Sequence, residues 1–246
     1  MTTKEQVLQN CTVEGNVVKL PNKQLDRKLY QDVAKALELI GGKWKGGKEA
    51  GFVFVTDPTD LLEQIAGGDK RNLKKEFQFF GTPDALADEV VIYANLKEDD
   101  TILEPSAGQG AIIKAINKDC NVVPDCYELM DVNTIILKKS GLRFNLIGDD
   151  FLNHKGKTYS KIIANPPFSK NQDIDHLKEM YYCLKDGGRL VCITSKSWEN
   201  GSQKKQVDFR AWLDKVNANV ISLEAGTFKE SGTMVGGNII IIDKKL

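Results

Sequence analysis

The amino-acid sequence predicts an α/β protein: a doubly wound, mostly parallel, Rossmann-like sheet of seven strands with a C-terminal antiparallel hairpin. Two observations support this fold class. From residue 82 onward, short apolar runs alternate with helix-length amphipathic segments. The runs also end in glycine-rich or acidic turns, as parallel strands do where a ligand binds. A small α+β module is expected before this domain, which divides the chain into 1–77 and 78–246.

The period of the apolar residues gives the elements of the second domain in order. Strands are expected at Thr101–Glu104, Val122–Glu128, Phe144–Ile147, Lys161–Ala164, Arg189–Thr194, Val220–Glu224 and Asn238–Ile242. Helices are expected at Asp84–Leu96, Gly110–Lys118, 131–140, Ile174–Leu184 and Val207–Val216. Gly187-Gly188 is expected to close the fourth helix. Because parallel strands share one carboxyl rim, Glu104, Glu128, Asp150 and Asn165 should lie along it.

The first 77 residues follow a different pattern. The expected elements are an amphipathic helix over Leu25–Ile40, a basic glycine-rich loop over Gly42–Gly51, a strand over Phe52–Val55 and a short helix over Pro58–Ile65. Asp57 is the expected cap of the short helix. This order is similar to a winged-helix-like or recognition module, and an appendage that only packs against the sheet is the alternative.

Composition excludes several classes of protein. The hydrophobic fraction is 41%, the charged fraction 28% and the net charge zero, as in ordinary globular domains. No apolar run is long enough for a membrane span, and the N-terminus lacks the order of a secretion signal. The five cysteines lack Cys-x-x-Cys spacing, which predicts reduced thiols in a cytoplasmic protein. With only two histidines, no metal site is expected.

The most specific segment is Asn165-Pro166-Pro167-Phe168, directly after the strand Lys161–Ala164. Proline lacks an N–H and holds the residue before it extended, so the carbonyl oxygens here are available as acceptors. An amino group on a flat ring would donate two hydrogen bonds to such acceptors while the ring stacks on Phe168. The plainer alternative is a strand-to-loop turn, because Asn and Pro are common turn residues.

A second segment, Glu104-Pro-Ser-Ala-Gly-Gln-Gly110, links a β-branched strand to a helix. Its glycines allow close approach of a ligand to the backbone, although the sequence is not the GxGxxG fingerprint. Glu128 ends the next strand, 20 residues after Gly108, where a carboxylate can accept the hydroxyl groups of a ribose. Taken alone, Glu128 would be read as a solvated surface carboxylate.

Together, these segments resemble the S-adenosyl-L-methionine-dependent DNA adenine-N6 methyltransferases, in a compact, phage- or mobile-element-like form. The resemblance covers roughly 78–243 and follows the family's order. It implies a catalytic motif of Asn165, Pro166, Pro167 and Phe168, and a late hairpin motif at Phe228–Thr233 followed by Gly237–Ile242. It also implies a set of cofactor-binding residues: Phe80, Thr82, Glu104, Ser106, Ala107, Gly108, Gly110, Glu128, Asp150, Phe151 and Asn165.

In that family Glu128 would bind the ribose, Asp150 the adenine amino group and Phe151 the adenine ring. No cysteine follows a proline, which argues against the cytosine-C5 enzymes. The alternative activities are methylation of RNA adenine or of protein glutamine. A non-catalytic nucleic-acid-binding subunit is the alternative of another class.

The expected partner is DNA with a base flipped into the site. Clustered basic and aromatic residues are the candidate contacts: Lys196, Trp198, Lys204, Lys205, Lys43, Trp44 and Lys45. For any one cluster taken alone, a plain solvated face is the favoured interpretation. Members of the family that read a defined DNA sequence usually carry a sizeable recognition domain. We therefore expect that sequence specificity is low, comes from 1–77, or is supplied by a second copy in a homodimer or by a separate specificity partner.

Overall fold

The computed structural model describes residues 2–47, 50–54, 57–69, 81–228 and 236–245. The chain divides into two compact units, Met1–Gln78 and Phe79–Leu246. Each unit encloses hydrophobic clusters of its own. The sequence-predicted residues Phe80 and 229–233 lie outside the described residues.

Unit 1 combines helices with a four-stranded antiparallel sheet of order β1-β2-β4-β3. Its elements are α1 (Lys4–Gln9), β1 (Thr12–Glu14), β2 (Val17–Lys19), α2 (Arg27–Leu39), β3 (Lys43–Lys45), β4 (Gly51–Val53) and α3 (Thr59–Ala66). The apolar period of α2 places Val33 and Leu37 in the core against Phe52 of β4.

Two expectations for unit 1 need correction. Lys43–Lys45 forms the edge strand β3 instead of a loop, because its backbone pairs with Gly51–Val53. The short helix begins at Thr59, one residue later than expected. Asp57 still caps this helix as far as its first N–H group is concerned, since Asp57 Oδ1 accepts from the Thr59 N–H at 2.9 Å.

Unit 2 contains a seven-stranded sheet with helices on both faces. Its strands are β5 (Ile102–Glu104), β6 (Asp125–Tyr127), β7 (Asn145–Gly148), β8 (Tyr159–Ala164), β9 (Leu184–Ser195), β10 (Asn219–Ser222) and β11 (Gly237–Asp243). Its α-helices are α5 (Asp84–Ala94), α6 (Ala111–Asp119), α7 (Asp131–Lys139), α8 (Gln172–Tyr182) and α9 (Lys204–Lys215).

The strand order, β10-β11-β9-β8-β5-β6-β7, confirms the predicted fold class. Neighbouring strands from β7 to β9 are parallel, and β11 runs antiparallel to both β9 and β10, as the expected hairpin requires. From β5 the chain builds outward to β7 and then returns to β8 on the other side of β5. The direction of winding therefore reverses between β5 and β8, and ligands bind at such a switch point.

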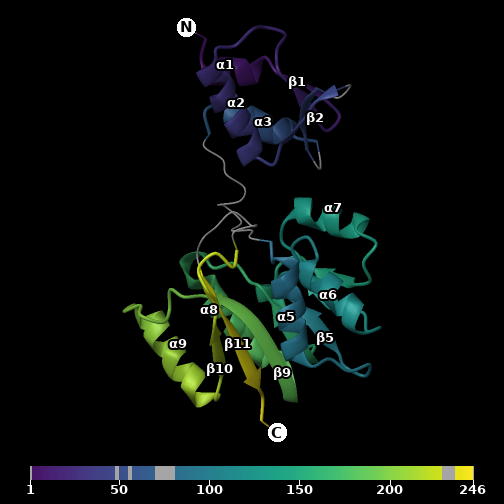
Figure 1. Ribbon diagram of the computed structural model, residues 1–246, viewed down its shortest axis with the longest axis vertical. Helices are drawn as coiled ribbons and strands as arrows, with labels where there is room; N and C mark the ends of the chain where they lie inside the picture. The colour runs from purple at the N-terminus through teal and green to yellow at the C-terminus, as the bar shows by residue number, and fades with distance from the viewer. Residues whose placement is uncertain (1, 48–49, 55–56, 70–80, 229–235, 246) are drawn as a thin grey trace. The chain divides into compact units, whose positions relative to one another are not determined.

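Helices cover both faces of the sheet (Figure 1), and alternating residues of the central strands are buried on opposite faces. Ile163 and Val191 pack in one cluster with α5 and α6. Ile162 and Leu190, one residue earlier in each strand, pack in the other cluster with α8 and α9. Because both faces are covered, the polar ends of the strands are the part of the sheet left for a ligand.

Gly187-Gly188 does not close a helix, which corrects the sequence-based expectation. Both glycines lie inside β9, which begins at Leu184. The Gly187 N–H donates to the Lys244 carbonyl, and the Lys244 N–H donates to Gly188. A Cβ at Gly188 would stand 2.9 Å from the carbonyl oxygen of Ser160. The glycines therefore permit a close approach of three chain segments at this end of the sheet.

Within the described residues, no helix combines the length and apolar character needed to cross a bilayer. The same residues contain no cluster of three or more His, Cys, Asp or Glu side chains arranged to hold a metal ion.

Candidate functional site

Glu104 and Asn165 end the two strands that flank the switch point. β5 ends at Glu104, and Asn165 directly follows Ala164, the last residue of β8. The two strands are parallel, with Leu103 in register with Ile162. The most specific of the sequence-predicted motifs therefore meet at the carboxyl ends of adjacent strands.

The carboxyl group of Glu104 is enclosed by protein, with 1% of the residue exposed. Its Oε1 accepts from the Ser106 N–H at 3.2 Å, and its Oε2 is buried without a hydrogen-bond partner among the described residues. Burial, opposed by the Ser106 hydrogen bond and reinforced by the charge of Glu128, raises the pKa of Glu104 to about 8. An unsatisfied buried carboxyl oxygen is costly, so the site is suited to a cationic or hydrogen-bond-donating ligand.

Glu128 clamps the turn that follows β5 onto the end of β6. Its Oε2 accepts from the Gly108 N–H at 2.6 Å, and its Oε1 accepts from the Met130 N–H at 2.7 Å. Asn133 Nδ2 adds a third donor at 3.2 Å. Burial raises the pKa of Glu128 against these hydrogen bonds. The sequence indicated a ligand for Glu128 but gave no sign that the same carboxylate holds the glycine turn.

Positive φ angles explain both glycines of this turn. Gly108 has φ of 57° and Gly110, which precedes α6, has φ of 89°. A Cβ at Gly110 would stand 2.7 Å from Leu137 Cδ1 and 2.8 Å from Leu142 Cδ1. Glycine is therefore needed here for backbone conformation and for packing against the segment that follows β6.

The acidic turn after β7 is present, but the aromatic residue next to it is not on the surface. Asp150 Oδ1 accepts from the Leu152 N–H at 3.0 Å. Phe151 is 1% exposed and packs edge-on against Tyr127, with ring centroids 5.7 Å apart. Exposed apolar surface is instead offered by Leu152 and by Leu129, which directly follows Glu128. Sequence reasoning missed both leucines, since each is an isolated apolar residue in a turn.

A hydroxyl group from the segment before α5 orients the amide of Asn165. Asn165 Nδ2 donates to Thr82 Oγ1 at 3.0 Å, across 83 positions of sequence. Thr82 was predicted to bind a cofactor, and the structure places its hydroxyl group on Asn165. Phe168 packs edge-on against Phe228, with centroids 6.1 Å apart, so the late hairpin motif begins beside the Asn-Pro-Pro-Phe segment.

The assignment of Trp198 to nucleic acid must be corrected. Its ring is 5% exposed, packs edge-on against Phe209 and donates from Nε1 to Thr194 Oγ1 at 3.2 Å. Its neighbour Lys196 is partly buried and donates to Ser222 Oγ at 2.7 Å. The tryptophan is therefore part of the core between the sheet and α9.

The other basic candidates lie on surfaces. Lys204 is exposed at the start of α9, whereas Lys205 pairs with Asp175 of α8. In unit 1, Lys43 and Lys45 flank Trp44 on the exposed edge strand β3. Trp44 is 49% exposed and has Phe52 at 5.2 Å on one side, which leaves part of the indole open to solvent.

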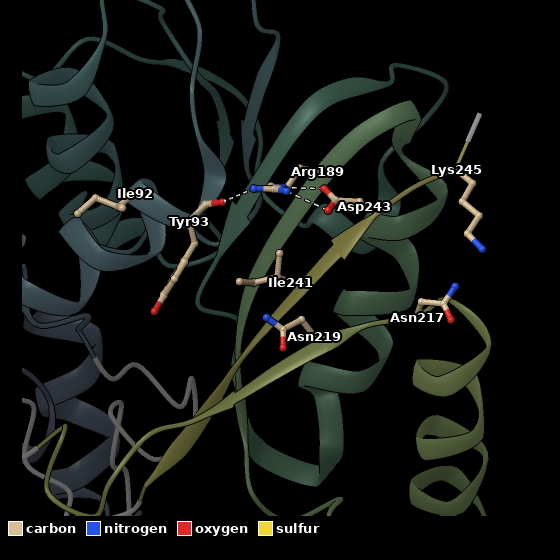
Figure 2. Close-up of a pocket in the computed structure, with 8 residues that line it drawn as sticks. All are labelled: Ile92, Tyr93, Arg189, Asn217, Asn219, Ile241, Asp243 and Lys245. Carbon is tan, nitrogen blue, oxygen red and sulfur yellow. Dashed lines mark hydrogen bonds and ion pairs between the residues drawn. The ribbon is translucent and has the colours of Figure 1, made fainter.

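Figure 2 shows a surface pocket of about 530 Å³. The register of its lining residue Arg189 places it at the opposite end of β8 from Asn165. Arg189, in register with Lys161 near the start of β8, forms part of its lining. The Arg189 guanidinium pairs with both carboxylate oxygens of Asp243, at 2.6 and 2.9 Å, and also donates to the Tyr93 carbonyl. Its charge is thus compensated locally, and no sequence-predicted site residue lines the pocket.

No protein-family model matches this sequence. Among solved structures, a type I restriction-modification methyltransferase subunit from Streptococcus thermophilus is similar with a TM-score of 0.54 and 18% identity, over 68% of this chain and 44% of its own. A putative class I S-adenosylmethionine-dependent methyltransferase from Listeria monocytogenes has a TM-score of 0.55 and 14% identity, over 99% of this chain and 79% of its own.

A putative RNA methyltransferase from Pyrococcus horikoshii is also similar, with a TM-score of 0.53 and 14% identity over 88% of this chain and 98% of its own. These likenesses establish a methyltransferase-type fold. The chain spans about half the length of the type I subunits that it matches, between 44% and 55%.

The raised pKa of Glu104, about 8, predicts a stability that depends on pH. Because the folded state binds this proton more tightly than the unfolded state, stability is greatest below the unfolded pKa and falls as pH rises toward 8. The slope from this group is at most about 1.4 kcal/mol per pH unit. Chemical denaturation between about pH 5 and about pH 8 should show the decline, and Glu104→Gln should make it clearly shallower by removing the contribution of Glu104.

Glu98→Gln, a change at an exposed carboxyl group on the same unit, is the matched control and should keep the wild-type slope. An equal slope in wild type and Glu104→Gln would show that Glu104 is not the group responsible.

The burial of Trp198 predicts that its truncation acts on stability. Trp198→Ala should lower the free energy of unfolding by about 3–5 kcal/mol, because a large buried ring is lost. Trp44→Ala removes the same side chain from an exposed strand and should cost clearly less. Urea denaturation measures both losses. A Trp198→Ala protein as stable as wild type would contradict the place of this ring in the core.

Proposed function

We propose that this chain is an S-adenosyl-L-methionine-dependent methyltransferase that acts on the exocyclic amino nitrogen of adenine in DNA. One observation supports this more than any other. The Asn165-Pro-Pro-Phe168 segment stands at the switch point of a methyltransferase-type sheet, with its amide oriented by Thr82. An oriented amide beside an aromatic ring is the arrangement that a planar amino group requires.

The residues of the neighbouring turn fit the cofactor. S-Adenosyl-L-methionine carries an ammonium group and, on a sulfonium centre, the methyl group to be transferred. Glu104 Oε2, buried without a partner among the described residues, would accept from the ammonium group. Ser106, Ala107, Gly108 and Gly110 offer a backbone with small side chains or none, and the two glycines adopt positive φ there.

Glu128 and Asp150 would bind the nucleoside part of the cofactor. Three N–H groups already donate hydrogen bonds to the Glu128 carboxylate. Its oxygens can accept about one more, from a ribose hydroxyl group. Asp150 would meet the adenine amino group. Leu129 and Leu152, exposed on the same rim, would cover the adenine ring in place of the buried Phe151.

The acceptor amine is a weak nucleophile, because its lone pair is delocalised into the ring. Asn165 Oδ1 and the carbonyl oxygen of Pro166 would accept the two amino hydrogens and stabilise the positive charge that grows on nitrogen. Phe168 would hold the base by stacking. As the nitrogen gains the methyl group, the bond between the methyl carbon and the sulfonium sulfur would break, and the methylated nitrogen would then release one proton to solvent.

DNA is favoured as the substrate by the type I restriction-modification likeness and by the basic, aromatic edge strand of unit 1. Lys43 and Lys45 would contact phosphates and Trp44 would offer a stacking surface. Lys196 and Lys204 would add phosphate contacts on unit 2. Sequence specificity would come from unit 1, a second copy or a separate specificity subunit. RNA adenine is the second candidate, since an RNA methyltransferase shares the fold.

Asn165→Ala should lower the rate of methyl transfer on the order of 10²-fold or more, because an acceptor of the amino hydrogens is lost. The affinity for S-adenosylhomocysteine, measured by calorimetry, should stay near that of wild type. The assay follows labelled methyl transfer from S-adenosyl-L-methionine to unmethylated bacterial DNA, to RNA and to a glutamine peptide in parallel. Wild-type turnover by Asn165→Ala would disprove the mechanism.

The same assay decides between the substrates. Transfer to RNA or peptide alone would replace DNA as the substrate. DNA binding without any cofactor binding or transfer would instead indicate a non-catalytic subunit.

Thr82→Val should lower kcat by roughly tenfold, since the Asn165 amide would lose the partner that fixes its orientation, a loss worth about 1–3 kcal/mol for a buried donor. Thr82→Ser keeps the hydroxyl group and should retain most of the activity. Initial rates at saturating cofactor separate this effect from a loss of cofactor affinity. If Thr82→Val weakened only cofactor binding, Thr82 would be a cofactor ligand as the sequence first indicated.

A further inference from the structure

The chain leaves the Asn165–Phe168 motif through two consecutive left-handed residues that are not glycine. Lys170 has φ of 53° and ψ of 28°, and Asn171 has φ of 57° and ψ of 38°. Left-handed conformations are unfavourable for residues with a Cβ, although asparagine tolerates them better than most. Two such residues in succession persist only where surrounding contacts fix them.

Asn171 stands at the N-cap position of α8 without capping that helix. An N-cap asparagine ordinarily accepts from the backbone N–H groups of the first turn. The Asn171 side chain makes no such bond. Its hydrogen-bonding groups are instead directed at another part of the chain.

Three side chains beyond β9 bind the Asn171 amide. Its Nδ2 donates to Gln203 Oε1 at 3.2 Å. Its Oδ1 accepts from Ser197 Oγ at 3.0 Å and from Gln206 Nε2 at 3.3 Å. Gln206 also donates to the Ser197 carbonyl at 3.1 Å, which closes the network. Asn171 is thus fixed by Ser197 in the segment Ser195–Gly201, by Gln203 just before α9, and by Gln206 in the first turn of α9.

That segment, Ser195–Gly201, is itself held to the sheet. The N–H and Oγ of Ser195 both donate to the buried Asp173 Oδ2, at 2.9 and 2.8 Å. Asn238 of β11 donates to Glu199 Oε1 at 2.7 Å. A segment anchored to α8 and to β11 is a firm support for whatever it binds in turn.

We propose that Asn171 is a positioning residue, which fixes the Asn165–Phe168 motif against the Ser195–Gly201 segment. This inference rests on the proposed function and adds a residue that the sequence motif does not include. Only three positions separate Phe168 from Asn171, so a change in the backbone at Asn171 moves the aromatic ring and the carbonyl groups that receive the amine. Ser195–Gly201 also carries Lys196, so the acceptor strand and the catalytic amide would share one support.

The test compares Asn171→Ala, Asn171→Gly and Asn171→Asp. With S-adenosyl-L-methionine and unmethylated bacterial DNA, kcat should fall between about 10- and 100-fold in the alanine and glycine variants, since a small misplacement of reacting groups has effects of this size. Affinity for S-adenosylhomocysteine should not change. Asn171→Asp keeps the acceptor for Ser197 and Gln206 and should recover part of kcat.

Asn171→Gly distinguishes an effect of the lost amide from an effect of strain in the left-handed backbone. It relieves the left-handed backbone but lacks the amide, so wild-type kcat in Asn171→Gly would overturn the proposal. Asn95, which has φ of 50° at the C-cap of α5, provides the matched control: Asn95→Ala places alanine in the same conformation at the other end of the strands and should leave kcat unchanged. Equal losses of kcat and cofactor affinity in Asn171→Ala would also overturn it.

Hydrogen–deuterium exchange tests the contact without relying on activity. Asn171→Ala should raise exchange in Ser195–Gly201 as well as around residues 168–171, and Ser197→Ala should do the same to a smaller extent. If the wild-type protein methylated none of the substrates, the proposed function would fail. Hydrogen–deuterium exchange in Ser195–Gly201 would still test whether Asn171 holds this segment. Unchanged exchange in Ser195–Gly201 would overturn the coupling.

Discussion

The reversal of winding between β5 and β8 is the constraint on which the rest of the site depends. The connections that leave these two strands run in opposite directions, so neither covers the end of the other strand. Buried polar atoms without partners among the described residues gather along this rim: Glu104 Oε2 at the end of β5, Asp173 Oδ1 beside the end of β9, and Asn238 Oδ1 at the start of β11. Folding alone gains nothing from such atoms, so the stability of the fold does not account for them.

Several buried acidic groups with raised pKa values lie along this rim. Burial raises the pKa of Glu104, Glu128 and Asp173, which means that the protein holds acidic groups where ionisation is difficult. A cation brought to such groups makes their ionised form more favourable and is bound in return. The glycine turn is held in place by one of these same carboxylates, through the Gly108 N–H. The shape of the turn and the acidic character of the rim therefore depend on the same carboxylate.

The sequence predicted the sheet well because its strands are short apolar runs that end at motifs with fixed backbone requirements. Asn-Pro-Pro ends β8 at Ala164, and the glycine turn ends β5 at Glu104, as expected. What it could not predict depends on partners distant in the chain. Thr82 meets Asn165 across 83 positions, and Trp198 is buried because Phe209 of α9 packs against it. A basic run such as Lys43–Lys45 has no apolar period, so its pairing with β4 left no sign in the sequence.

The same electrostatics explain why an amide, and not a carboxylate, stands at position 165. Burial already raises the pKa of the neighbouring Glu104 and Glu128, and a carboxylate in place of Asn165 would add a like charge, which favours the protonated form of a carboxyl group. A protonated carboxyl group has less capacity to accept hydrogen bonds from an amine. In the proposed reaction the Asn165 oxygen would be an acceptor at every pH, and the bond from its nitrogen to Thr82 would direct that oxygen toward the amine. A neutral acceptor with a fixed orientation is therefore the group best suited to receive amino hydrogens beside buried acids.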